Sequence, residues 1–141
     1  MISEFRGRWT KFSNYSIGSV WYKDKMYPSA EHAYQAQKST DPIKQQWIRN
    51  AATPNESKKR ARTVELRSDW EIVKIDIMEE ILREKFSQEP ERSILLSSGN
   101  EDLVEGNWWG DKFWGQCPVG DGQNWLGKLL MKIRNEMNNA T

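Results

Sequence analysis

The chain has 141 residues, of which 37% are hydrophobic and 29% charged, and this suffices for one domain with its own core over residues 1–141. The formal net charge of +1 gives no electrostatic argument for a nucleic-acid or membrane-surface protein, and no apolar run is long enough to cross a membrane. A single cysteine (Cys117) and a single histidine (His32), with no apolar signal region at the N-terminus, predict a cytoplasmic protein without a disulfide framework, metal site or cofactor.

The first predicted element is a short hairpin. Val20–Tyr22 and Met26–Tyr27 favour strands, and the polar residues Lys23–Lys25 separate them as a turn. Pro28 ends the hairpin. Ser29 is a capping residue, and the strong helix formers after it predict a helix through about Lys38.

Capping signals predict three further helices in the middle of the chain. Asp41 before Pro42 opens a helix through about Asn50. Thr53 and Glu56 have the spacing of a capping box, as do Ser68 and Glu71. The second box introduces the longest helix, because apolar residues recur there at helical spacing. These residues are Trp70, Val73, Ile77, Met78, Ile81, Leu82 and Phe86.

The last part of the chain is predicted to hold two helices and little else that is regular. Pro90 begins a helix that stops near Gly99, and Leu103–Val104 is a brief candidate strand. A final helix over 124–138 buries Leu126, Leu129, Leu130, Ile133 and Met137. Since helices dominate and strands do not alternate with them, we expect a predominantly helical α+β domain with a small sheet near the N-terminus.

Tryptophan is concentrated in residues 107–115 and 120–127, which hold four of the eight in the chain, interleaved with glycine, asparagine and aspartate. Aromatic rings offer flat apolar walls, and glycine lets the backbone approach a ligand closely. The pattern therefore predicts a binding pocket. A phosphate-binding P-loop is not indicated, because Lys128 is followed by Leu129 where that motif needs serine or threonine.

Two carboxylates are candidates for chemistry on a sugar. Glu31 lies in the first turn of its predicted helix, where the helix dipole favours the ionised form. Such a group beside an anomeric carbon stabilises an oxocarbenium-like transition state or activates water, although first-turn acids also occur for helix stability alone. Asp111, among Trp109, Phe113 and Trp114, is either a desolvated general acid or a turn cap.

Basic residues provide candidate phosphate ligands. Lys38 follows Glu31 by seven residues, so both side chains lie on one helix face. The run Lys58–Arg62 is typical of a solvated helix face, with Arg62 as a candidate phosphate contact.

Five segments in order resemble the YbiA-like, or NADAR, family of N-glycosidases. They read FSNY (12–15), YPSAEHAYQAQK (27–38), RSDWE (67–71), DKFWG (111–115) and NWLGKLLM (124–131). The resemblance spans about residues 12–134. It implies a YbiA-like fold and a hydrolase that cleaves the N-glycosidic bond of a phosphorylated riboside. The implied substrates are riboflavin-pathway intermediates of the 5-amino-6-ribosylaminouracil 5′-phosphate type or ADP-ribose conjugates, including ADP-ribosylated nucleic acid.

The resemblance also implies roles for individual residues. Glu31 corresponds to the catalytic glutamate of the family, and Asp111 is a candidate donor of a proton to the leaving base. The residues expected to bind substrate are Asn14, Lys38, Arg62, Trp70, Trp114, Asn124 and Trp125. Ala61 stands where the family resemblance implies a glycine, and the loop 115–120 is less glycine-rich than is usual in the family. If that loop contacts the base, substrate choice is expected to differ from that of better-known members.

Two other functions are compatible with the same residues. A module that binds ADP-ribose or a modified nucleotide without cleaving it would use the aromatic pocket, with Glu31 only supporting its helix. A tryptophan-rich binder of single-stranded nucleic acid is disfavoured by the near-neutral charge.

Overall fold

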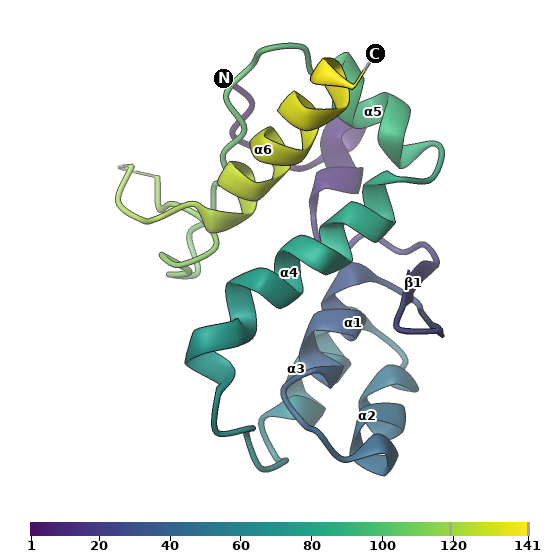
Figure 1. The fold of residues 1–141 in the computed structure, drawn as a ribbon. Helices are drawn as coiled ribbons and strands as arrows, with labels where there is room; N and C mark the ends of the chain where they lie inside the picture. The colour runs from purple at the N-terminus through teal and green to yellow at the C-terminus, as the bar shows by residue number, and fades with distance from the viewer. Residues whose placement is uncertain (119, 141) are drawn as a thin grey trace. The chain divides into compact units, whose positions relative to one another are not determined.

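The computed structural model describes residues 1–118 and 120–140, and its helices and strands are labelled in Figure 1. These residues fall into two units, a central unit of Asn14–Lys85 and a terminal unit of Met1–Ser13 with Phe86–Thr141. Helices are the main regular elements of each unit, and the described residues form one two-stranded sheet. The predicted α+β class is therefore confirmed, whereas the single domain stays a prediction.

The sheet is the predicted hairpin, with strands β1 (Val20–Tyr22) and β2 (Lys25–Tyr27) antiparallel. Its turn is one residue shorter than predicted, because Lys25 pairs with Tyr22. Lys23 and Asp24 have φ of 49° and 66°. Two successive positive φ values are those of a type I′ turn, whose twist matches that of the flanking strands.

Three short helices of the central unit begin at the predicted caps and pack against one another (Figure 1). They are α1 (Ala30–Ala36), α2 (Pro42–Arg49) and α3 (Pro54–Ala61). The backbone amides of His32, Ile43 and Glu56 donate to the side chains of Ser29, Asp41 and Thr53 at 3.0, 2.9 and 3.1 Å. Each cap satisfies a backbone donor that the first helical turn leaves free. Helix α1 ends two residues before the predicted Lys38.

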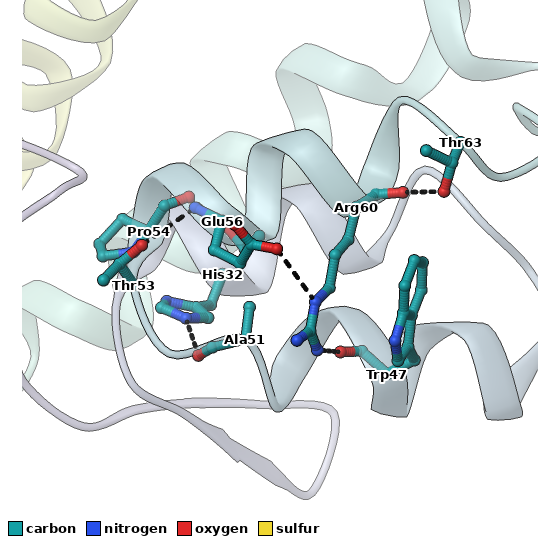
Figure 2. A network of polar contacts seen from close by, with 9 residues as sticks. His32, Trp47, Ala51, Thr53, Pro54, Glu56, Arg60 and Thr63 are labelled. Carbon is teal, nitrogen blue, oxygen red and sulfur yellow. Dashed lines mark hydrogen bonds and ion pairs between the residues drawn. The ribbon is translucent and has the colours of Figure 1, made fainter.

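His32 is the buried centre of this helical group. Its Nε2 lies 3.0 Å from the carbonyl of Ala51 (Figure 2), and its Nδ1 lies 2.7 Å from Ser29 Oγ. A carbonyl only accepts, so Nε2 carries the proton and Nδ1 accepts from the serine hydroxyl. Burial lowers the pKa of His32, against an opposing effect of the Ala51 hydrogen bond. The neutral ring thus links α1 to the segment before α3.

Arg60 joins α3 to α2. Its guanidinium donates to the Trp47 carbonyl at 2.7 Å and lies 5.1 Å from the centre of the Trp47 ring. An ion pair with Glu56 at 3.7 Å holds the same group (Figure 2). Arg60 therefore stabilises the packing of α3 against α2.

The longest helix is α4 (Trp70–Phe86), and it lies where the apolar spacing predicted it. Asp69 rather than Ser68 directly precedes it, and the Asp69 carbonyl accepts from the amides of residues 72 and 73. Tyr22 donates to Glu80 at 2.5 Å, which ties the hairpin to α4. The predicted apolar positions of α4 are buried except for half-buried Val73.

The terminal unit contains a 3₁₀ helix η1 (Gly7–Phe12), α5 (Glu91–Ser97) and α6 (Trp125–Asn139). The sequence reading did not predict η1, which buries Phe12 beside the rings of Trp9 and Phe86. The brief strand predicted at Leu103–Val104 is a single bridge between Leu103 and Ile2. Of the predicted apolar residues of α6, Met137 alone is half-buried and the rest are buried. Throughout the described chain, every helix is too short or too polar to cross a membrane.

Candidate functional site

Glu31 is the second residue of α1, and its side chain is buried in the central unit, with 7% of the residue exposed. Its backbone amide donates to the carbonyl of Asn14 at 3.0 Å. One carboxylate oxygen, Oε1, accepts from Nε2 of Gln35 at 2.7 Å, one helical turn later. The first contact fixes the backbone of Glu31 at the start of α1, and the second fixes its carboxylate.

Aromatic rings lie next to Lys38, which follows α1. The rings of Tyr34 and Trp70 have centres 5.0 Å apart. The Lys38 ammonium lies 5.7 Å from the Tyr34 ring and 5.8 Å from the Trp70 ring. These distances are typical of cation–π contacts, which orient the half-buried lysine.

The pKa of Lys38 is also influenced by charged groups of α1, α3 and α4 in the central unit. Burial lowers the pKa of Lys38, and the neighbouring cations Lys58, Arg62 and Lys74 lower it further, while Glu31 raises it. Arg62 is exposed at the end of α3, and Lys74 of α4 pairs with Glu71 at 2.6 Å. Lys38 therefore has three cations and one carboxylate as charged neighbours, a locally positive arrangement that favours an anionic ligand.

Asn14 contributes a buried polar group beside Glu31. The residue is 6% exposed, and its amide nitrogen lies 3.6 Å from the sulfur of Met78. Its side-chain oxygen Oδ1 has no hydrogen-bond partner among the described residues. Buried polar atoms are rarely left in this state, so Oδ1 marks a place where a donor is missing.

In the terminal unit, Asp111 caps a turn. Its Oδ1 accepts from the backbone amides of Phe113 and Trp114 at 3.1 and 3.0 Å. The side chain of Asn107 holds both the amide and the carbonyl of Asp111, at 3.1 and 2.9 Å. Of the two alternatives for Asp111, this geometry favours the turn cap, and the general-acid role stays a prediction.

Asn124 is used in a similar way. It precedes α6 with a left-handed backbone (φ 52°). Its Oδ1 accepts from the amide of Glu105 at 3.0 Å, and its Nδ2 donates to the carbonyl of Leu103 at 2.9 Å. The side chain therefore joins the start of α6 to residues 103–105, and a contact with substrate stays a prediction.

The four tryptophans of the predicted pocket lie in two different environments, two half-buried and two exposed. Phe113 packs edge-on against Trp114 at 4.9 Å and lies 6.5 Å from the ring of Trp125. Trp108 and Trp109, by contrast, are exposed. Trp114 and Trp125 are thus half-buried members of one aromatic cluster around Phe113.

The structure brings five of the nine predicted site residues together in the central unit, namely Asn14, Glu31, Lys38, Arg62 and Trp70. The other four, Asp111, Trp114, Asn124 and Trp125, belong to the terminal unit. The sequence reading missed Gln35, Tyr34, Lys58 and Lys74. The spacing of Gln35 and Tyr34 from Glu31, at i+4 and i+3 on one helix, was the signal available for two of them. In residues 1–118 and 120–140, no three His, Cys, Asp or Glu side chains are placed to hold a metal ion.

Comparison with known proteins gives consistent matches. A family model described as the NADAR domain matches residues 3–138. The chain is 42% identical over 134 residues to the N-glycosidase Npun_R5314 of Nostoc punctiforme, covering 91% of this chain and 85% of that protein. It is 37% identical over 129 residues to the N-glycosidase YbiA of Escherichia coli, covering 89% and 80%.

A solved structure and a longer plant protein extend these matches. The NMR structure of E. coli YbiA has a TM-score of 0.87 at 34% identity and covers 99% of this chain and 86% of that one. The riboflavin biosynthesis protein PYRR, chloroplastic, of Zea mays is 36% identical over 146 residues. That match takes in 89% of this chain but 23% of the maize protein.

Proposed function

Because this chain belongs to the NADAR domain family, in which the relatives from Nostoc punctiforme and Escherichia coli are named N-glycosidases, we propose that it hydrolyses the N-glycosidic bond of a phosphorylated riboside. The observation that carries the proposal is the buried Glu31 carboxylate near Lys38, whose charge is also influenced by Lys58, Arg62 and Lys74. A carboxylate suits the positive charge that develops on a ribose during bond cleavage, and the cations suit a phosphate on the same substrate.

In the proposed reaction, the bond between ribose C1 and the base nitrogen lengthens, and positive charge spreads over C1 and O4. Glu31 stabilises that charge and takes a proton from the attacking water. The hydrogen bond from Gln35 holds the carboxylate in place. Fixed groups stabilise a transition state at little cost of reorganisation, and burial of Glu31 strengthens this effect.

The remaining residues of the central unit bind the substrate. Lys38 and Arg62 bind the phosphate, and Arg62 has the planar geometry for a bidentate contact. Asn14 accepts a hydrogen bond from a ribose hydroxyl, since its Oδ1 is a buried acceptor without a partner among the described residues. Trp70 and Tyr34 keep Lys38 directed toward the ligand.

For the substrate we propose early riboflavin-pathway intermediates of the 5-amino-6-ribosylaminouracil 5′-phosphate type. The similarity to a maize riboflavin biosynthesis protein supports this class. ADP-ribose conjugates, free or on nucleic acid, carry the same phosphorylated ribose and are the second class to test. For Trp114 and Trp125, contact with the base stays a prediction from the family resemblance.

The test is a substrate panel with purified protein. It contains two early riboflavin intermediates, their dephosphorylated forms, NAD, ADP-ribose and DNA carrying ADP-ribosylated guanine. Released base and sugar are quantified by chromatography for the wild type and for Glu31→Gln. We expect release from a phosphorylated substrate that the Glu31→Gln substitution abolishes. Binding of intact ligand without any product would instead identify a non-catalytic binding module.

A further inference from the structure

The orientation of the Gln35 side chain is fixed by its partner. Its amide lies 2.7 Å from Oε1 of Glu31, and a carboxylate only accepts hydrogen bonds. The nitrogen of the amide must therefore face Glu31, and the oxygen must point elsewhere. This settles the usual ambiguity between the two amide atoms without reference to the rest of the network.

The oxygen of the same amide lacks a donor. Gln35 is 2% exposed, and its Oε1 has no hydrogen-bond partner among the described residues. A buried carbonyl oxygen without a donor is unfavourable, and such atoms are rare in folded proteins. Gln35 thus carries a buried acceptor without a donor and also hydrogen-bonds the carboxylate of Glu31.

An attacking water needs two acceptors if both of its hydrogens are to be held while a lone pair faces C1. The Glu31 carboxylate takes one hydrogen in the proposed reaction, which leaves the second. Resting on that reaction, we propose that Oε1 of Gln35 accepts the second hydrogen and so orients the nucleophilic water. Gln35 then has two contacts with the reaction, one through Glu31 and one with the water.

The step balances without any further reactant. The water oxygen forms a bond to C1, while the electron pair of the C1–N bond leaves with the base, which takes up a proton from solvent. One water proton passes to Glu31 and is later released. The other stays on the new sugar hydroxyl and is held by Gln35 Oε1 during the attack.

Methanol distinguishes this role from simple support of Glu31. It carries one hydroxyl hydrogen, so it uses the carboxylate but has no second hydrogen for Gln35. Gln35→Met keeps the length of the side chain and removes both amide atoms. If Gln35 only supports Glu31, the substitution slows attack by water and by methanol alike. If Oε1 of Gln35 also holds the water, its loss slows attack by water alone.

The experiment measures the ratio of methyl riboside to free ribose product in water–methanol mixtures. One neutral hydrogen bond of about 1 kcal/mol corresponds to about a fivefold change, so we expect Gln35→Met to raise the ratio by about that factor. Gln37→Met is the matched control. Gln37 is also buried near the end of α1, and it donates to the Tyr27 hydroxyl at 3.3 Å, so its loss should leave the ratio unchanged.

An unchanged ratio in an active, folded Gln35→Met protein overturns the proposal even if kcat falls. If that variant does not fold, Gln35→Asn carries the same test, because its shorter side chain withdraws both amide atoms. Wild-type protein that releases no base from any substrate overturns the proposed function, and with it this role. Turnover that depends on Glu31 together with an unchanged ratio removes the role of Gln35 alone.

Discussion

Asn14 in the central unit and Asn124 in the terminal unit are buried to nearly the same degree, at 6% and 4% exposure. Both amide atoms of Asn124 bind backbone groups of residues 103 and 105. Asn14 instead leaves its Oδ1 without a partner among the described residues. Two asparagines buried to a similar degree thus differ in the hydrogen-bonding capacity that is left for a ligand, and this difference supports the proposed contact between Asn14 and the substrate.

The two carboxylates repeat this contrast. Oδ1 of Asp111 accepts hydrogen bonds from two backbone amides of a turn. Glu31 is held by a side chain, Gln35, within a positively charged surface. Asp111 therefore stabilises a turn, whereas the contacts of Glu31 with Gln35 and its proximity to Lys38 support its proposed role in catalysis.

The largest expected effect is that of Glu31→Gln on turnover. An amide can neither balance developing positive charge nor take a proton, so we expect kcat to fall by about 10²- to 10⁴-fold. The fold should persist, since the substitution preserves shape. Steady-state kinetics and thermal unfolding check both parts, and near-normal turnover would remove Glu31 from its proposed role.

Asn124 should matter for stability. Asn124→Ala leaves two backbone groups unpaired and places alanine at a left-handed φ, so we expect a loss of about 2–4 kcal/mol in the free energy of unfolding. Urea denaturation measures it. Asn124→Gly is the matched control, because glycine relieves the φ strain but not the lost hydrogen bonds. Asn14→Ala should change stability less and raise KM.

Lys38→Met should weaken binding of a phosphorylated substrate by about 10- to 100-fold, from loss of a charged hydrogen bond. The dephosphorylated substrate should show little change. Burial lowers the pKa of Lys38 below 10.5, against an opposing effect of Glu31 and with smaller lowering effects of three neighbouring cations. The charge of Lys38 is therefore lost as pH rises through that lowered pKa. KM should therefore rise at alkaline pH in the wild type. Lys38→Arg should remove this rise, and an unaltered pH profile there would contradict phosphate binding by Lys38.

His32 should make stability depend on acid. Burial lowers its pKa in the folded protein below 6.5, so the unfolded chain binds more protons in acid. Its contribution is complete above pH 6.5 and declines below it, by at most about 1.4 kcal/mol per pH unit. Unfolding of the wild type and of His32→Gln, measured from pH 7.5 to 5, should differ in slope. Parallel curves would mean that His32 does not titrate in this way.

The smallest expected effect belongs to Asp111→Asn. An asparagine oxygen can still accept from the amides of Phe113 and Trp114, so a turn cap predicts nearly unchanged turnover and stability. Asp111→Ala should lower stability instead. A large loss of kcat in Asp111→Asn, with the fold retained, would restore the role as general acid.

Sequence reasoning succeeded where the cause is local. The caps Ser29, Asp41 and Thr53 act on amides two or three residues away, so spacing along the chain predicts them. The length of α4 followed from its apolar period. The hairpin turn was misjudged by one residue, since nothing in the composition of Lys23 and Asp24 announces two left-handed residues.

The site was harder to predict, because its residues act over long separations. Asn124 was expected to bind substrate, which stays a prediction, and its structural hydrogen bonds to residues 19 and 21 positions earlier could not be read from the sequence. Gln35 was overlooked although it lies only four residues from Glu31. A glutamine in a helix is common, and its value appears only when the contact with Glu31 fixes which amide atom is left over.

Lys58, Arg62 and Lys74 each repel the charge of Lys38, and if the proposed phosphate binds there, this repulsion links folding to ligand occupancy. Like charges held close together lower the free energy of unfolding of the unliganded protein. An anion that neutralises them removes this repulsion, and the free energy gained adds to the affinity for the anion. Dissolved salt should then act in two directions at once, since it screens the repulsion and also competes with the anion. The same ions that raise the melting temperature of the free protein should reduce the further stabilisation that a phosphate ligand provides.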